Sequence, residues 1–411
     1  MIPVTKSPTS NRTLRGRFSA YTLVELLIVM SIMVLLAAVA LPSVKDLLAN
    51  QQVAKTARNI SAFIDKARSR AIAEGRYVGV RIERLNTLDP VGRAQSIRIR
   101  ELTSVPPYTG DASNAYATLK TDTNYANASL SYVSVAEFDP SDNALLALSA
   151  SMVENTSMTL SDILTPASGP NDDEHAPVRS GDYIELPGGR LVAFKIQYRA
   201  LNAATTVPVK LMFDLSEMRT LGTKAFPSGN PMFPTGGRRI KYKIHRRPVV
   251  STAAPFSLPR GVAIDLNYSG TGMEGNEFAP SPITSDIQGG FNAKPIDIIF
   301  GPDGSVVSTT TAYSDVPTFP QGQIFVCLGD SDGIRPDNLF TPEKKAPANL
   351  VNLESKWIVI NPGTGRVVSS PFSSVSSLPA GTIIDPYDAS LDPAITEARL
   401  LANFADTVDI E

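Results

Sequence analysis

The segment RRIKYKIHRRP, residues 238–248, contains six Arg or Lys side chains within eleven residues. If it forms a strand, alternation places Ile240, Tyr242 and Ile244 on one face and a basic row on the other. A basic row on a strand can follow a phosphate backbone, and its candidate DNA-contacting residues are Arg239, Lys241 and Lys243. We favour the ordinary alternative, in which the segment is a half-exposed strand or a sheet edge protected by its cations.

The segment GDSDGIRPDN, residues 329–338, brings three carboxylates together. Asp330, Asp332 and Asp337 could supply oxygen ligands to calcium, but their spacing differs from that of the twelve-residue EF-hand loop. We therefore favour a polar surface turn and expect no bound metal or other cofactor.

Few residues are suited to enzymatic chemistry. The two histidines, His175 and His245, are seventy positions apart, and the single cysteine, Cys327, lies in the apolar run IFVCL, which predicts a buried strand. The nucleophile-elbow, metalloprotease, phosphate-loop and dinucleotide-binding motifs are missing from the sequence. The formal charge of -2 argues against a general nucleic-acid-coating protein. We expect a protein that is not an enzyme.

The N-terminal region combines a basic leader with an apolar run. Residues 1–20 contain four cations and no acid, and residues 26–44 contain no charge. Nineteen helical residues at about 1.5 Å each nearly cross a hydrocarbon core of roughly 30 Å, so the run predicts a transmembrane helix. Glu25 at its start is unexpected for a plain anchor, because an unpaired charge inside a membrane costs on the order of 3 kcal/mol.

This region resembles the type IV prepilin signal: a basic leader, small Ala20, then Tyr21 and the sequence TLVE before the apolar run. The resemblance implies cleavage after Ala20, methylation of the new Tyr21 amine and pairing of Glu25 with that amine on a neighbouring subunit. Helices of that family commonly contain a proline within the part used for assembly, and Pro42 is at the corresponding place. Ala20 and Tyr21 depart from the Gly and Phe that the family usually has there.

A helix is expected over residues 21–75, with residues 21–44 as transmembrane segment and filament core. In its rear half, apolar residues at alternating steps of four and three form one face, and Gly75 ends the helix. Alternating runs at 77–85 and 95–102 predict a first hairpin. The expected domains are a leader at 1–20, the helix, and a β-rich extracytoplasmic body at 76–411. The stretch 103–180 is expected to be an insertion of loops with a short helix near 142–151.

Further resemblance is to the H-type minor pseudopilins of type II secretion and to FimT-like pilins. It rests on the junction ARSRAIAEGRYVGVRI and on LPRGVAIDL, IIFGPDGSVVS and WIVINPGTGRVVSS, in which PDG and NPGTG also predict tight hairpin turns. The resemblance implies an α+β, pilin-like fold, with the long N-terminal helix packed on an antiparallel body.

The expected function is that of a structural subunit of a pilus or pseudopilus. By resemblance its partners are other pilin-like subunits, a prepilin peptidase, the inner-membrane assembly platform and, before assembly, membrane lipid. The expected location is the bacterial inner membrane, which the chain would cross once, with its body in the periplasm or outside the cell. After assembly the chain would be part of a filament. The filament would belong to a system for protein transport. Two alternatives stay open: a filament-displayed module that binds DNA or a surface, and a single-pass envelope protein that never polymerises.

Overall fold

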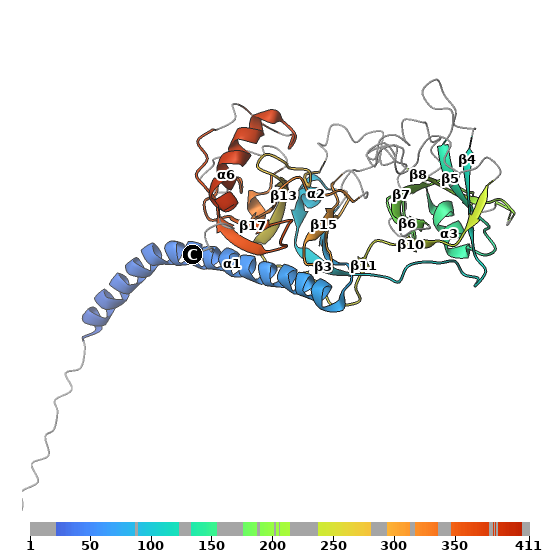
Figure 1. Ribbon diagram of the computed structural model, residues 1–411. Helices are drawn as coiled ribbons and strands as arrows, with labels where there is room; N and C mark the ends of the chain where they lie inside the picture. The colour runs from blue at the N-terminus through green and yellow to red at the C-terminus, as the bar shows by residue number, and fades with distance from the viewer. Residues whose placement is uncertain are drawn as a thin grey trace, which may run out of the picture. The chain divides into compact units, whose positions relative to one another are not determined.

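The computed structural model describes residues 22–86, 89–122, 133–153, 176–186, 190–200, 203–204, 206–213, 237–280, 294–312, 317–335, 347–377, 381, 383 and 385–404. For residues 39–50, 90, 121–122, 133–134 and 190 it describes only the backbone. The chain divides into two compact units, Met1–Gln51 and Gln52–Glu411. One helix, α1 (Leu23–Glu74), continues across the boundary between them (Figure 1).

The rear part of α1 packs on the β-rich body through the apolar face that its sequence predicts. The buried residues on this face are Val53, Ala57, Ile60, Ile64, Ala67 and Ala71. The helix ends as expected at Gly75, whose φ is 62°, and the amide of Arg76 donates to the carbonyl of Ala71 over 3.2 Å. This is the Schellman ending, which needs a residue that tolerates positive φ.

Two antiparallel sheets share a core with α1. The six-stranded sheet has the order β11-β3-β1-β14-β15, and β12 also pairs with β3. The five-stranded sheet has the order β18-β17-β16-β13-β2. Their strands are β1 (Val78–Glu83), β2 (Gln95–Ser96), β3 (Arg98–Thr103), β11 (Val249–Val250), β12 (Phe256–Ser257), β13 (Val262–Thr271), β14 (Ile296–Phe300), β15 (Val306–Thr309), β16 (Ile324–Asp330), β17 (Lys356–Ile360) and β18 (Val367–Pro371).

The predicted hairpins of this region are confirmed. Strands β1 and β3 pair antiparallel, and the short helix α2 (Pro90–Ala94) lies in their connection. The PDG turn joins β14 to β15, and the NPGTG turn joins β17 to β18. Their glycines, Gly304 and Gly365, have φ of 82° and 65°, which only glycine adopts without strain.

The C-terminal helix α6 (Asp392–Phe404) covers the other face of the five-stranded sheet. The side chains of β17 show this division directly. Ile358 and Ile360 belong to the core that contains α1, whereas Trp357 and Val359 belong to the core that contains α6. All ten residues of β13 are buried, as expected for a strand covered on both faces.

A seven-stranded sheet with the order β10-β6-β7-β8-β5-β4-β9 encloses a second core together with α3 (Ala144–Met152). Its edge strands, β9 (Arg238–Ile240) and β10 (Lys243–His245), are separated by only two residues of chain. The sheet must therefore curve until its two edges meet at one segment. The other strands are β4 (Ala117–Asp122), β5 (Val133–Phe138), β6 (Tyr183–Leu186), β7 (Arg190–Ile196) and β8 (Val209–Phe213).

Two local expectations need correction. The stretch 103–180 was expected to consist of loops with one short helix; α3 is that helix, but β4 and β5 are strands of the seven-stranded sheet. The segment 238–248 was expected to be one strand, but it divides into β9 and β10, which pair with different neighbours. In both cases strand partners that are distant in sequence decide the structure, and a local pattern does not show them.

The expected fold class, an α+β pilin-like fold with a transmembrane front half, is wrong. The described chain consists mainly of antiparallel strands in three sheets, one of them strongly curved. Within the described residues, no helix has the length and apolarity needed to cross a membrane. This finding contradicts the expected single-pass location in the bacterial inner membrane. It also contradicts the expected description of the chain as a membrane-anchored pseudopilin of protein secretion.

Candidate assembly surface and basic segment

The start of α1 is fixed by Thr22. Its hydroxyl oxygen accepts a hydrogen bond from the amide of Glu25 over 3.2 Å, and its carbonyl accepts one from the amide of Leu26 over 3.1 Å. Thr22 is therefore the N-cap and Glu25 the third helical residue. The spacing T-x-x-E could have indicated this cap from the sequence.

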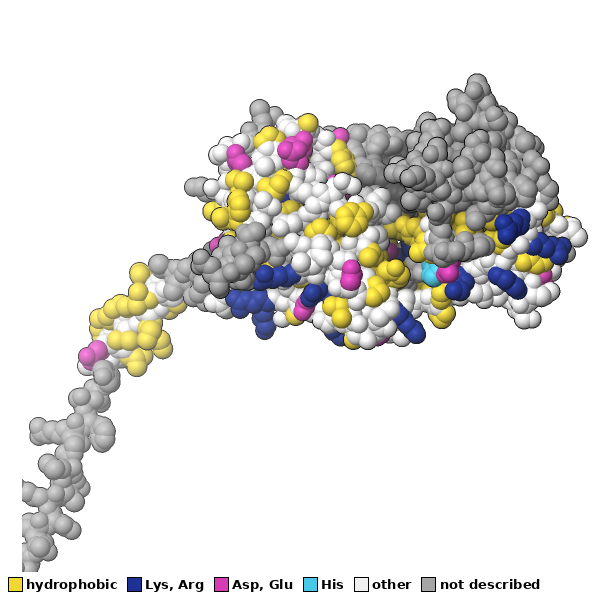
Figure 2. Space-filling model, viewed as in Figure 1, with side chains coloured by type: hydrophobic (Ala, Val, Ile, Leu, Met, Phe, Trp, Pro, Cys, Tyr) yellow, Lys and Arg dark blue, Asp and Glu magenta, His cyan; other side chains and the backbone are white. Residues whose placement is uncertain are grey.

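The first turns of α1 expose apolar side chains all around the helix. The large hydrophobic residues from Leu23 to Leu36 are between 49% and 81% exposed. They are Leu23, Val24, Leu26, Leu27, Ile28, Val29, Met30, Ile32, Met33, Val34, Leu35 and Leu36. Figure 2 shows this hydrophobic segment in yellow. A helix that is apolar all round is stable only when it is buried, and burial of each such side chain contributes about 1.5–3 kcal/mol. The segment therefore presents an apolar surface that burial would stabilise.

The predicted processing and assembly residues are only partly within the described chain. Glu25 is exposed, and its side chain has no hydrogen bond or ion pair with any residue that the structure describes. Ala20 and Tyr21 lie outside the described residues, as does the side chain of Pro42, whose backbone is part of α1. The pairing of Glu25 with a Tyr21 amine stays a prediction.

The candidate DNA-contacting cations are engaged within the chain. The Arg239 guanidinium lies over the ring of Tyr116, 4.1 Å from its centroid. The Lys241 ammonium donates to the carbonyls of Ser113 and Ala115 over 3.1 and 3.0 Å. Lys243 and Glu185 form an ion pair at 3.4 Å. The three cations are exposed, but they do not form the free basic row that a single strand would have presented.

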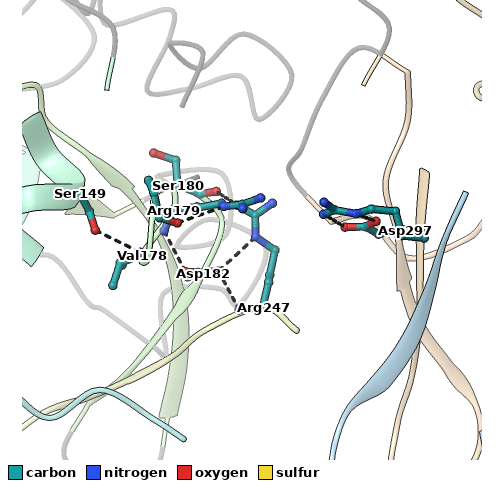
Figure 3. Close-up of polar contacts among 9 residues, drawn as sticks. Ser149, Val178, Arg179, Ser180, Asp182, Arg247 and Asp297 are labelled. Atoms are coloured by element: carbon teal, nitrogen blue, oxygen red, sulfur yellow. Dashed lines mark hydrogen bonds and ion pairs between the residues drawn. The ribbon is translucent and has the colours of Figure 1, made fainter. Parts of the chain in front are cut away.

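The end of the basic segment is anchored by buried and half-buried acids. His245 Nε2 lies 2.8 Å from Glu185 Oε2, and this hydrogen bond is the main cause of a lowered Glu185 pKa. Asp182, which is 1% exposed, accepts hydrogen bonds from both the amide and the Nε of Arg247 over 3.1 Å. It also accepts one from the amide of Arg179 over 2.9 Å (Figure 3). Arg247 thus joins the segment to the loop before β6.

The predicted apolar face of the segment is confirmed. Ile240, Tyr242 and Ile244 are all buried in the second core. The hydroxyl of Tyr242 donates to the side-chain oxygen of Asn143, which precedes α3. The segment is therefore an integral part of the curved sheet. DNA binding by its cations stays a prediction. The contacts that these cations make within the chain explain their presence without DNA.

The carboxylates of GDSDGIRPDN are placed only in part. Asp330 Oδ1 accepts the amide of Asp332 over 2.9 Å and so caps the short 3-10 helix η4 (Ser331–Gly333). Asp337 lies outside the described residues, as does His175. Among the residues with a described position, no group of three His, Cys, Asp or Glu side chains could hold a metal ion.

Cys327 is buried, as predicted, and burial raises the pKa of its thiol.

A buried carboxylate, that of Asp265, lies next to Cys327, and no sequence pattern predicted it. Asp265 is fully buried and accepts hydrogen bonds from the Asn349 amide nitrogen over 3.0 Å and from the Asn267 backbone over 3.1 Å. Asn349 in turn accepts the amide of Asp330 over 2.9 Å. Burial raises the pKa of Asp265 to about 7, against the opposing effect of these hydrogen bonds. The group ties β13 to the end of β16.

Comparisons with known proteins do not assign the chain to a family. No family model matches it, and neither the curated proteins nor the solved structures contain a match. The functional argument therefore depends on the chain's own residues.

Proposed function

We propose that the chain is a structural subunit that assembles with copies of itself into a filament through residues 22–38 of α1. The observation that carries this proposal is the exposure of every large apolar side chain from Leu23 to Leu36. The resemblance stated from the sequence implies a structural subunit too, but one that assembles with other pilin-like subunits through the same helix.

The distribution of these side chains favours several partners. A helix that pairs with one neighbour needs a single apolar stripe, whereas this segment is apolar on all sides. Helices in the centre of a bundle bury all of their faces. A bundle of such segments from many copies would remove the exposed hydrophobic surface from water.

The rear of α1 is held firmly enough to present such a segment. Arg68 Nε donates to the carbonyls of Gly304 and Thr364 over 3.3 and 3.0 Å, which ties the helix to both hairpin turns. Arg70 forms an ion pair with Glu101, a carboxylate that is almost completely buried. These contacts fix the rear half of α1 to the body.

Charge placed in the apolar segment tests the proposal. Ile28→Lys should prevent assembly, because a lysine in a helix bundle would be buried without a partner. Ser69→Lys is the matched control, because Ser69 is exposed on the rear half of the same helix. The full chain is purified from cells that produce it and examined by sedimentation and electron microscopy. Filaments from wild type and Ser69→Lys but not from Ile28→Lys support the proposal; equal assembly by all three overturns it.

The alternative function, DNA binding through the basic segment, has weaker support. Lys241 and Lys243 already bind carbonyls and a carboxylate of the same chain. Among the residues that the structure describes, no contact favours DNA over these partners.

A further inference from the structure

A buried polar cluster joins strands β13 and β16 to the segment 347–355, which forms turns and no helix or strand. Asp265 and Asn349 are both 0% exposed, and the Asn349 side-chain nitrogen donates to Asp265 Oδ2 over 3.0 Å. The same nitrogen donates to the Asp330 carbonyl over 3.1 Å, and Asn349 Oδ1 accepts the Asp330 amide over 2.9 Å. Among the described residues, every other hydrogen bond of the segment joins two of its own residues. One amide side chain therefore supplies its polar attachment to both strands.

Two glycines leave room for the Asn349 side chain. A Cβ at Gly329 would overlap Asn349 Oδ1, and a Cβ at Gly333 would lie 2.5 Å from the same atom. A side chain at either position would displace the amide from Asp265. The contact between Asn349 and Asp265 therefore depends on a site that the backbone of β16 and η4 is shaped to leave open.

Asp265 has no cation to balance its charge. Its other oxygen, Oδ1, accepts the backbone amide of Asn267 over 3.1 Å. Both of these donors are neutral, and Asp265 forms no ion pair with any residue that the structure describes. A carboxylate buried in this way is stable only while it holds a proton, or when water reaches it.

The charged and titratable groups around Asp265 do not change this balance. On its own strand and on β16 the titratable groups that interact with it are Tyr268 and Cys327. Burial raises the pKa of each well above its ordinary value, so both are neutral at pH 7. The other charged groups on the elements packed there, none of which pairs with Asp265, are Arg93 on α2, Arg399 on α6, Asp330 and Asp332 at η4, and Glu354 in the segment 347–355.

The segment also shields Cys327. Asp265 and Cys327 are directly opposite in the antiparallel pair of β13 and β16, and opposed side chains lie on the same face of a sheet. Leu350, the neighbour of Asn349, packs with Cys327 in the core that contains α6. A movement that takes Asn349 away from Asp265 therefore uncovers the thiol as well.

We propose that the segment 347–355 is a pH-controlled flap, which is closed over Asp265 and Cys327 while Asp265 is protonated and opens when Asp265 loses its proton. This inference does not depend on the proposed filament. Opening brings the charged carboxylate into water, and the segment moves more readily than the strands because no strand ladder holds it. The change falls near neutral pH, because burial raises the pKa of Asp265 to about 7.

The two forms of the flap bind the proton with different affinity, and this difference fixes the pH dependence. In the open form Asp265 is in water, where its ordinary pKa is 3.8; in the closed form the pKa is about 7. Between these values opening releases a proton, so the open fraction should rise about tenfold per pH unit. Above about pH 7 both forms are ionised, and the open fraction should stay constant.

Cys327 is the only cysteine of the chain and reports the opening. The full chain is treated with methyl methanethiosulfonate, and the rate of modification is followed by mass spectrometry from pH 5 to pH 9. Each rate is divided by the rate for the chain unfolded in urea at the same pH, which cancels the ionisation of the thiol itself. We expect this ratio to rise about a hundredfold from pH 5 to pH 7 and then to level off. A ratio that does not change with pH overturns the proposal.

Two variants assign the effect to Asp265. Asp265→Asn has no proton to lose, so its ratio should not change with pH. Asp303→Asn is the matched control, because Asp303 is an exposed aspartate in the turn between β14 and β15, and its ratio should follow that of wild type. A rise with pH that persists in Asp265→Asn overturns the proposal.

Urea below the unfolding transition separates opening of the flap from unfolding of the whole chain. Opening of one segment exposes little surface, so the modification rate of wild type should depend only weakly on urea. A urea dependence as steep as that of complete unfolding would show that Cys327 is reached only in the unfolded chain, and it would overturn the proposal. This measurement uses the wild-type chain and decides the question even if Asp265→Asn does not fold.

Discussion

Glu25 is the acidic residue at the start of an otherwise apolar segment. Its backbone amide donates to the Thr22 hydroxyl that caps the helix, a bond that does not depend on its side chain. Gln has nearly the same shape as Glu, but only Glu has the charge that is predicted to pair with a cation on a neighbouring subunit. Glu25→Gln therefore removes that charge and leaves the cap in place.

We expect Glu25→Gln to leave α1 intact and to reduce assembly strongly, measured as the fraction of protein in sedimented filaments. The reason is that the substitution keeps the cap but removes the charge that is predicted to pair with a Tyr21 amine. Thr22→Ala is the complementary control, since it removes the cap and keeps the charge. Undiminished assembly of Glu25→Gln would contradict a role for the Glu25 charge in assembly.

Asp265 makes stability depend on pH. Its pKa is about 7 in the folded chain, because burial disfavours the charged form, and 3.8 is the ordinary value for the unfolded chain. Between these values the folded protein holds a proton that the unfolded chain has lost. The free energy of unfolding should therefore fall as pH rises from about 4 to about 7. Urea denaturation across this range measures the slope.

The variant Asp265→Asn isolates this contribution. It removes the titrating group, so the fall in stability between pH 4 and 7 should be smaller than in wild type. The difference between the two profiles cancels the effect of all other carboxyl groups. Parallel profiles would contradict the assignment, whatever the absolute stability of the variant.

At the residue scale, the sequence predicts those features that depend on near neighbours. Gly75 as helix end and Cys327 as a buried strand residue both follow from local patterns and are confirmed. The partners of Lys241 and the bond between Asp265 and Asn349 do not, because they join residues 126 and 84 positions apart. Pairing over such distances is decided by the whole fold.

The attachment of α1 to the hairpin turns depends on a glycine at a crowded position. A Cβ at Gly365 would overlap the carbonyl oxygen of Gly304, and Gly365 also has a positive φ. Gly261 has a similar φ but open space around it. We expect Gly261→Ala to cost about 1–2 kcal/mol from backbone strain alone, and Gly365→Ala to cost about 3 kcal/mol or more. Chemical denaturation compares them; equal losses would show that the turns can move apart freely.

At the element scale, alternation identified the strands but not their partners. The alternating runs at 77–85 and 95–102 are confirmed as containing β1 and most of β3. Strands β4 and β5 were missed because the surrounding stretch is rich in small polar residues, which hides their alternation. The division of 238–248 into two edge strands depends on the curvature of the sheet, and no periodicity within eleven residues shows it.

At the scale of the whole molecule, the proposed outcome is a filament held together by burial of the apolar front of α1. Surface ion pairs are weakened by salt, because the Debye length shortens from about 10 Å at 0.1 M to about 3 Å at 1 M. Burial of apolar helices is not weakened in this way. We therefore expect cross-links within the α1 bundle to persist at about 1 M salt, as measured by gel electrophoresis of matched samples. Loss of these cross-links at about 1 M salt would contradict burial of the apolar segment as the main contact between copies.

The central claim is that residues 22–38 of α1 pack against the same segment in other copies. The most direct test replaces Ile28 with the photo-cross-linking residue benzoylphenylalanine in cells that produce the full chain, with the same replacement at exposed Ser69 as control. After illumination and mass spectrometry, the account predicts a species of two chains joined at position 28 to a peptide from residues 22–38 of the second copy. If position 28 yields no joined chains, or joins copies no more often than position 69, the account is contradicted.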